Sequence, residues 1–168
     1  MRIAISILLI LLLADAAGVC GAFELVSTDF AAGGMIPALH TCDGKNISPH
    51  LAWRNPPQGT KSFALICHDP DAPVGTFIHW IVYDIPAGAR ELTRNGPLPP
   101  GARQLHNDFG TIGYGGPCPP SGTHRYIFTL YGLAVERLGN VTRETIAALL
   151  RQHQTGTATL TGLYERRR

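Results

Sequence analysis

Two stretches of the chain carry side chains that can bind anions or move protons. "HDPDAPVGTFIHWIVYDIP" (68–86) contains Asp69 and His79, and "GYGGPCPPSGTHRYIFTLYG" (113–132) contains His124. A carboxylate that accepts a hydrogen bond from an imidazole fixes its tautomer and favours its charged form. The remaining ring N–H groups, a tyrosine hydroxyl and backbone amides of the glycine-rich run can then face a small anion as donors.

Both histidines stand at the beginnings of predicted strands. "IHWIVYDI" (78–85) and "HRYIFTLYGLA" (124–134) are rich in β-branched and aromatic residues and are bounded by Gly and Pro. Since alternate residues of a strand share a face, Tyr126 lies on the face of His124, and Arg125 points to the other face. Each strand therefore has a histidine at its start, followed on the same face by a row of mostly apolar side chains.

The "DPDAP" segment is typical of a rigid strand exit. Pro70 has no backbone donor, and Pro73 restricts the residue before it to extended backbone. Asp69 and Asp71 then project in related directions, so Asp69 can accept a hydrogen bond from one of the histidines. The simpler interpretation is that each aspartate only supports the turn and that each histidine is structural.

The rest of the chain predicts a mainly β protein. The segments 62–68 and 157–164 are two further strands. One helix is expected, in which Thr142 caps "RETIAALLRQHQ", an apolar face is formed by Ile146, Leu149 and Leu150, and Gly156 follows the end. The Gly- and Pro-rich stretch 86–120 lacks periodicity, and we expect function in its "NDFGTIGYGGPCPPSG" region.

Composition limits the function classes. The 168 residues are 45% hydrophobic and 15% charged, as expected for one globular domain. The net charge of +2 comes without clustered Lys and Arg, apart from a C-terminal "RRR" that we interpret as a solvated tail, so no nucleic acid is expected as a partner.

The N-terminus has the pattern of an export signal. Arg2 supplies a positive start, and the apolar run 3–14 is too short to span a bilayer comfortably. Cys20 and Ala22 are small residues in the −3 and −1 positions of a cleavage site that would leave Phe23 as the first residue.

We therefore predict a signal peptide at 1–22 and a single domain at 23–168, in a protein that is exported to a periplasm or secreted. A lipid anchor on Cys20 is the alternative, which bulky Val19 disfavours. Export permits disulfides. Among the three remaining cysteines one bridge and one thiol are expected, and the residues alone leave all three pairings open: Cys42, Cys67 and Cys118.

The other histidines and the two tryptophans have no comparable group of polar residues near them in the sequence pattern. We interpret the former as surface or locally hydrogen-bonded residues: His40, His50, His68, His106 and His153. Trp53 and Trp80 are expected in the core rather than in a ligand platform.

The ordered motifs resemble the phosphatidylethanolamine-binding protein family, specifically its bacterial Raf-kinase-inhibitor-like branch. "DPDAP", the following "HW" and "GYGGPCPPSGTHRYIFTLYGL" carry the resemblance, together with "TCDGKNISPHLAW" (41–53), "NDFG" (107–110) and "LTGLYER" (160–166). The similarity covers nearly all of residues 24–166.

The resemblance implies a β-sandwich of two antiparallel sheets with a small pocket at one end for phosphate-like anions. Carried over by position, the ligand-binding residues are Asp69, Asp71, His79, Pro119, His124 and Tyr126. Arg125 would be a structural partner behind its strand, and Phe77 stands where relatives often have Trp. The implied fold also places Cys42 and Cys118 in loops on the pocket side, which favours their pairing.

The expected function is accordingly that of an exported binding protein for phosphate or a phosphorylated head group, with no catalytic residue, metal or cofactor. Alternatives are an interaction or inhibitor module acting through its surface, a Ser121/His124 hydrolase without a G-x-S-x-G elbow, and a zinc site at His79, His124 and Asp69. A homodimer is left open, and the protein partner is not specified by the sequence.

Overall fold

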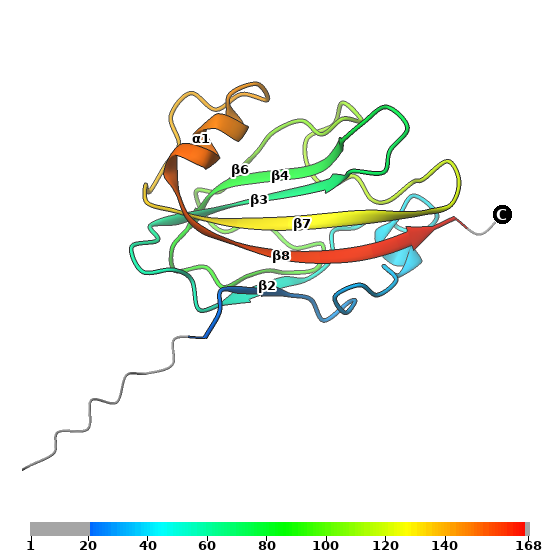
Figure 1. Ribbon diagram of the computed structural model, residues 1–168, viewed down its shortest axis with the longest axis horizontal. Coiled ribbons are helices and arrows are strands. Elements are labelled where there is room, and N and C mark those ends of the chain that lie inside the picture. Colours follow the sequence, from blue (N-terminus) through cyan, green and yellow to red (C-terminus); the bar gives the residue numbers. More distant parts are fainter. Residues whose placement is uncertain (1–20, 167–168) are drawn as a thin grey trace, which may run out of the picture.

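Two antiparallel sheets stacked as a sandwich form the protein, which the computed structural model describes for residues 21–166 (Figure 1). The larger sheet has the strand order β6 (Arg103–Gln104), β4 (Phe77–Pro86), β3 (Ser62–Asp69), β7 (Thr123–Leu133), β8 (Gln154–Glu165). The smaller sheet has the order β1 (Glu24–Val26), β2 (Leu51–Arg54), β5 (Glu91–Leu92). A 3-10 turn, η1 (Ala38–His40), and one helix, α1 (Ile146–His153), complete the fold. The predicted mainly β fold with two sheets and one C-terminal helix is confirmed.

The main core lies between the sheets. Its large side chains include Trp53, Phe63, Trp80 and Phe128, all buried, so both tryptophans are core residues as expected. A second apolar cluster covers the other face of the larger sheet beneath α1, where Ile146 and Leu150 are buried. Figure 1 shows α1 over one end of this sheet, away from the C-terminus.

Helix α1 begins later than the sequence pattern suggests. It starts at Ile146, and residues 143–145 form a turn before it. The Thr145 N–H donates to Oγ1 of Thr142 at 3.3 Å, and the Thr142 N–H donates to Oγ1 of Thr145 at 2.8 Å. Thr142 therefore makes the reciprocal bonds of a capping residue, but at the turn that leads into the helix.

The four predicted strands are present as β3, β4, β7 and β8. Strand β8 begins at Gln154, directly after α1, so Gly156 lies inside the strand rather than after the helix in a loop. The four short strands of two to four residues were not predicted, because so few residues carry no measurable alternation.

One end of the larger sheet gathers the motifs singled out in the sequence. Strand β3 ends at Asp69, opposite Phe77 at the start of β4. Strand β7 starts nearby, with Ile127 paired to His68. Because neighbouring strands are antiparallel, the end of one meets the beginning of the next, which brings residues far apart in sequence together.

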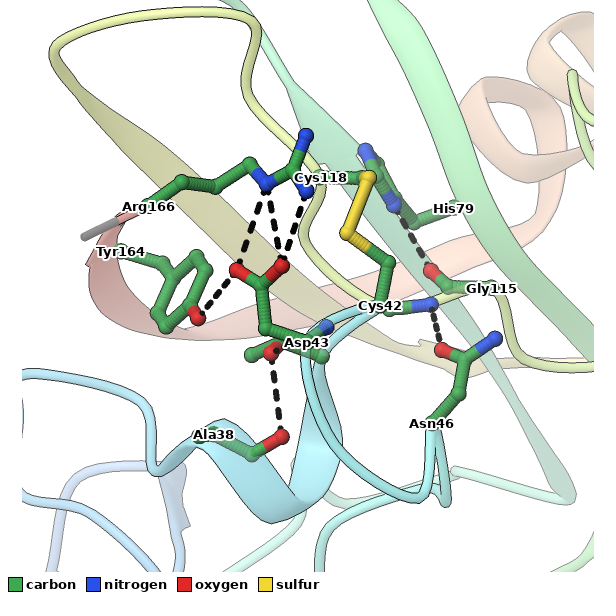
Figure 2. The surroundings of a disulfide bond; sticks show 11 residues. Ala38, Cys42, Asp43, Asn46, His79, Gly115, Cys118, Tyr164 and Arg166 are labelled. Carbon is green, nitrogen blue, oxygen red and sulfur yellow. Dashed lines mark hydrogen bonds and ion pairs between the residues drawn. A yellow bond between two sulfur atoms is a disulfide. The ribbon is translucent and has the colours of Figure 1, made fainter. Parts of the chain in front are cut away.

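A disulfide joins Cys42 and Cys118 at this end (Figure 2), and Cys67 is a buried thiol. The pairing favoured by the resemblance is confirmed. Apart from Gly21 and Ala22, the predicted signal peptide lies outside the described residues. Between residues 21 and 166, no helix is both long and apolar enough to cross a membrane.

Candidate binding pocket

A cavity of about 180 Å³ opens at the end of the larger sheet where β3 ends and β4 and β7 begin. Its polar lining consists of Asp69, His79, His124 and Tyr126. Its apolar lining includes Pro73, Val74, Phe77, Phe109, Pro119 and Pro120. The volume is below the roughly 300–1,000 Å³ of pockets for drug-sized ligands, so the cavity suits a small group.

Asp69 and His124 form a buried pair across β3 and β7. The carboxylate accepts a hydrogen bond from Nδ1 of His124 at 2.7 Å, and the two residues are 3% and 7% exposed. The second carboxylate oxygen accepts the Asp71 N–H at 2.8 Å. Both oxygens are thus engaged, and the ring of His124, which lines the cavity, is held in place.

His79 is oriented by main chain instead of by a carboxylate. Its Nδ1 lies 2.7 Å from the carbonyl oxygen of Gly115, which can only accept (Figure 2). The Gly115 N–H donates to the carbonyl of His79. Burial lowers the pKa of His79, opposed by the Gly115 carbonyl and by Asp69. The neutral ring is therefore the favoured form near pH 7, with its proton on Nδ1.

Tyr126 supplies a polar group with no protein partner. The side chain is fully buried, and its hydroxyl accepts or donates no hydrogen bond within the described part of the chain. Burial raises the pKa of Tyr126 far above its ordinary value, which keeps the hydroxyl protonated; the nearby Cys118 amide opposes the shift without forming a bond of normal geometry. The hydroxyl has no contact with solvent, and a buried polar group without a partner costs about 1–3 kcal/mol.

The carboxylate of Asp71 forms its hydrogen bonds outside the cavity. Its carboxylate accepts from Nε and Nη2 of Arg125 at 2.9 and 2.6 Å and from the Arg125 N–H at 3.0 Å. These bonds lower the pKa of Asp71 to about 2. Arg125 lies behind the strand, as the alternation predicts, and Asp71 stands beside the pocket where it fixes the strand exit.

An aromatic rim covers His79. The centroid of the Phe109 ring lies 4.8 Å from that of Phe77 and 5.4 Å from that of His79, and both contacts are edge-to-face. Phe109 itself is 48% exposed. Asn107 shapes this loop, since its side-chain oxygen accepts from the N–H groups of Phe109 and Thr111. Sequence reasoning singled out the "NDFG" segment but not Phe109 itself, because a lone aromatic residue in a loop has no periodic neighbours.

The wall formed by residues 113–120 is tied to the loop after η1. Besides the disulfide, the Gly116 N–H donates to Oδ1 of Asn46 at 2.7 Å, and the Tyr114 hydroxyl donates to the carbonyl of His40 at 2.9 Å (Figure 2 shows the former). His40 is 1% exposed, so it is not a surface residue; its Nδ1 bonds to the carbonyl of Ile47. These contacts hold Pro119 in the lining.

The alternative chemistries gain no support from this arrangement. Ser121 is exposed and does not line the cavity. Across the described residues, no group of three His, Cys, Asp or Glu side chains is placed to hold a metal ion.

The chain belongs to the phosphatidylethanolamine-binding protein family, whose model matches residues 26–165. Its bacterial and archaeal relatives include the UPF0098 protein of Aquifex aeolicus, which is 49% identical over 151 residues that cover 85% of this chain and 88% of the relative. The UPF0098 protein YbcL of Escherichia coli is 38% identical over 164 residues, covering 86% and 88%.

Solved structures agree with the family assignment. The crystal structure of E. coli YbcL has a TM-score of 0.81 at 36% identity and covers 86% of this chain and 99% of that one. A phosphatidylethanolamine-binding protein homolog from Chlamydia trachomatis also has a TM-score of 0.81, at 38% identity, with coverages of 87% and 99%. The predicted family is therefore confirmed.

Proposed function

We propose that the protein is an exported binding protein whose pocket holds phosphate or a phosphorylated head group. The observation that carries this proposal is the convergence of the His79 and His124 rings, with Tyr126 beside them, on one small cavity. Each imidazole has its Nδ1 engaged by the protein, and both rings line the cavity. Preorganised polar groups in a dry cavity bind more strongly than the same groups in water.

The surroundings support a compact polar ligand. The rim is made of proline and aromatic side chains, which exclude water but offer no hydrogen bonds. Asp69, the one carboxylate in the lining, is turned to His124 and the Asp71 amide, so its charge is partly compensated. The family name, phosphatidylethanolamine-binding protein, refers to a ligand with a phosphate group, in line with this chemistry.

A ligand screen by thermal shift tests the pocket. Phosphate and phosphoethanolamine should each raise the unfolding temperature, by more at higher ligand concentration, since a ligand bound only by the native state stabilises it. Zinc serves as the third probe. A strong response to zinc with none to either phosphate compound would replace the anion proposal with a metal site.

Export is the second part of the proposal and rests on the N-terminal pattern. The intact mass of the protein secreted by its host should correspond to a chain that begins near Phe23. A diacylglyceryl adduct on Cys20 would instead show a lipid-anchored protein.

A second candidate is an interaction module that docks a protein partner at the pocket mouth. Val74 is 85% exposed and Phe109 is 48% exposed at the rim. Pull-down with Val74→Ser and His124→Ala distinguishes the two roles: a partner lost only with Val74→Ser would favour the surface, and one lost only with His124→Ala would favour ligand-coupled binding.

A further inference from the structure

A second cleft, of about 340 Å³, lies at an edge of the sandwich and shares no lining residue with the pocket of His79 and His124. Strand β6 ends the order of the larger sheet and β5 that of the smaller one. The cleft is lined from β4 and β6, from the loop after β5 and from the loop before β2. Its polar side chains are Asn46, Ser48, Asn95 and Gln104, and its apolar ones include Trp80, Pro97, Leu98 and Tyr114. The volume falls within the roughly 300–1,000 Å³ of pockets for small organic ligands.

Two amide side chains of this cleft are held with their NH₂ groups unused. Oε1 of Gln104 accepts the indole N–H of Trp80 at 2.6 Å, and Oδ1 of Asn46 accepts the Gly116 N–H at 2.7 Å. Because an N–H can only donate, each amide oxygen is turned to the protein. Neither NH₂ group bonds to any residue between 21 and 166. The cleft therefore offers two oriented donor groups to the oxygens of a ligand.

Ser48 and Asn95 add groups that can donate or accept. The Asn95 N–H donates to the Ser48 carbonyl at 3.1 Å, which holds the two loops together through the main chain. Within the described part of the chain, neither side chain forms a hydrogen bond. A hydroxyl and an amide in such positions suit a ligand whose own groups both donate and accept.

The lining carries no charge. Of the described residues that line the cleft, none is Asp, Glu, Lys, Arg or His. The side chain of Arg94 is bonded to Asp29 and that of Arg103 to Asp84, and Lys45 lies outside the lining. A charged ligand would lose its water here without meeting an opposite charge, which costs far more than burying a hydroxyl that finds a hydrogen bond. The cleft therefore favours a neutral ligand.

From these contacts we propose that the cleft is a second binding site, which takes a neutral saccharide of one or two sugar rings. This site goes beyond the proposed function and does not depend on the anion pocket. Hydroxyl and ring oxygens of the sugar accept from the NH₂ groups of Asn46 and Gln104, and its hydroxyls also bond to Ser48 and Asn95. The C–H groups of the sugar ring contact the half-buried side chains of Leu98 and Tyr114.

Titration of the wild-type protein with glucose and with maltose, followed by ¹H–¹⁵N NMR, tests the site. The chain has two tryptophans, so its indole N–H signals separate the cleft from the core. The Trp80 indole, bonded to Gln104, should shift in a saturable way, while the buried and unpartnered indole of Trp53 stays fixed. If neither sugar gives a saturable shift at Trp80, the proposal is wrong.

Two further probes test the class of ligand on the same protein. Glucuronate differs from glucose by a carboxylate and should bind at least about ten-fold more weakly, because no cation in the lining offsets its charge. Equal affinity for glucuronate and glucose would contradict a neutral site. Acetyl-trialanine amide is the peptide probe, and a Trp80 shift caused by this peptide but by neither sugar would make the cleft a peptide site instead.

The double substitution Ser48→Ala and Asn95→Gly removes two side-chain groups that have no partner in the protein. Asn95 has a φ of 49°, which glycine adopts without strain, so the variant should fold. Loss of two hydrogen bonds should weaken sugar binding by about ten-fold or more. Asn140→Gly is the matched control, since Asn140 also has a φ of 49° but lies in the loop before α1.

Phosphate affinity of the same double variant shows whether the two sites are separate. It should stay at the wild-type value while sugar affinity falls, so failure of one site is seen independently of the other. Wild-type sugar affinity in the double variant, or an equal loss of sugar and phosphate affinity, would overturn the proposal of a second site.

Discussion

The carboxylate of Asp69 accepts the Nδ1 hydrogen of His124 at 2.7 Å, joining two residues that are 55 positions apart in the chain. Its other oxygen accepts the N–H of Asp71. The carboxylate thus links the rigid strand exit to the histidine at the mouth of β7. An asparagine has the same shape but only one acceptor oxygen, and cannot make both bonds.

Asp69→Asn should therefore change the tautomer of His124 and weaken phosphate binding. The amide NH₂ would face either the Asp71 N–H or the ring Nδ1–H, so one of the two hydrogen bonds made by Asp69 is lost. We expect an affinity loss of about ten-fold, with the tautomer read from ¹⁵N chemical shifts of the ring. Asp43→Asn is the control, since Asp43 bonds to Tyr164 and Arg166 outside the pocket. An unchanged His124 tautomer in Asp69→Asn would contradict this assignment.

Phe109→Ala should raise the pKa of His79. Desolvation is the largest cause of the lowered pKa, and the Phe109 ring contacts His79 on the solvent side. Removing the ring admits water, which stabilises the imidazolium. NMR titration of the imidazole measures the shift. Ile112→Ala is the matched control, because Ile112 is 63% exposed in the same loop and does not line the cavity; an equal shift in both variants would show that the rim does not control the ring.

The bonds between Asp71 and Arg125 should contribute to acid stability. The pKa of Asp71 is lowered to about 2 in the folded protein, against about 3.9 in an unfolded chain. A lowered folded pKa gives stability that is present above the unfolded pKa and is lost as pH falls toward 2. Asp71→Asn should lower the free energy of unfolding at pH 7 by about 1 kcal/mol, as for a well-formed exposed pair.

Urea unfolding at pH 7 and near pH 2 measures this difference. The gap between wild type and Asp71→Asn should nearly close at the lower pH. A gap of the same size at both pH values would mean that packing, rather than the charge on Asp71, accounts for the loss.

Opening the Cys42–Cys118 disulfide should loosen the pocket wall as well as the fold. The bridge closes a sequence separation of 76 residues, for which a loss of roughly 2–4 kcal/mol of stability is expected. Cys118 lines the cavity, and Gly115 in the same loop orients His79, so phosphate affinity should fall too. The double substitution Cys42→Ser and Cys118→Ser should show both losses under conditions where the protein remains folded. Cys67→Ala is the control and should leave affinity unchanged; a bridge-less variant with wild-type affinity would show that the wall is held by its hydrogen bonds alone.

The sequence predicts the long strands, and with them both histidine positions, because β3, β4 and β7 are runs of eight or more residues rich in β-branched and aromatic types and bounded by Gly and Pro. The sequence could not show which group bonds to each histidine ring. His124 pairs with Asp69 through strand register, and His79 is oriented by a carbonyl, a group that every residue carries. The lowered pKa of His79 follows from burial, and one of the rings that cover it, Phe109, reaches the rim through the loop geometry set by Asn107.

The family assignment came from ordered motifs, whereas the ligand chemistry depends on details that motifs do not contain. That Asp71 is bonded to Arg125 rather than facing the cavity is one such detail. The unpartnered hydroxyl of Tyr126 is another, since nothing in the residue order shows whether a tyrosine on an inner row finds a partner.

The affinity of inorganic phosphate for wild type and for His124→Ala, measured by isothermal titration at pH 7, tests the central claim most directly. Removing one charge-assisted hydrogen bond should cost about 1.5–3 kcal/mol, which weakens binding by about ten- to a hundred-fold. His153→Ala, at the far end of α1, controls for the loss of an imidazole elsewhere and should bind as wild type does. Phosphate that binds wild type and His124→Ala equally well would contradict the assignment of this pocket as the anion site.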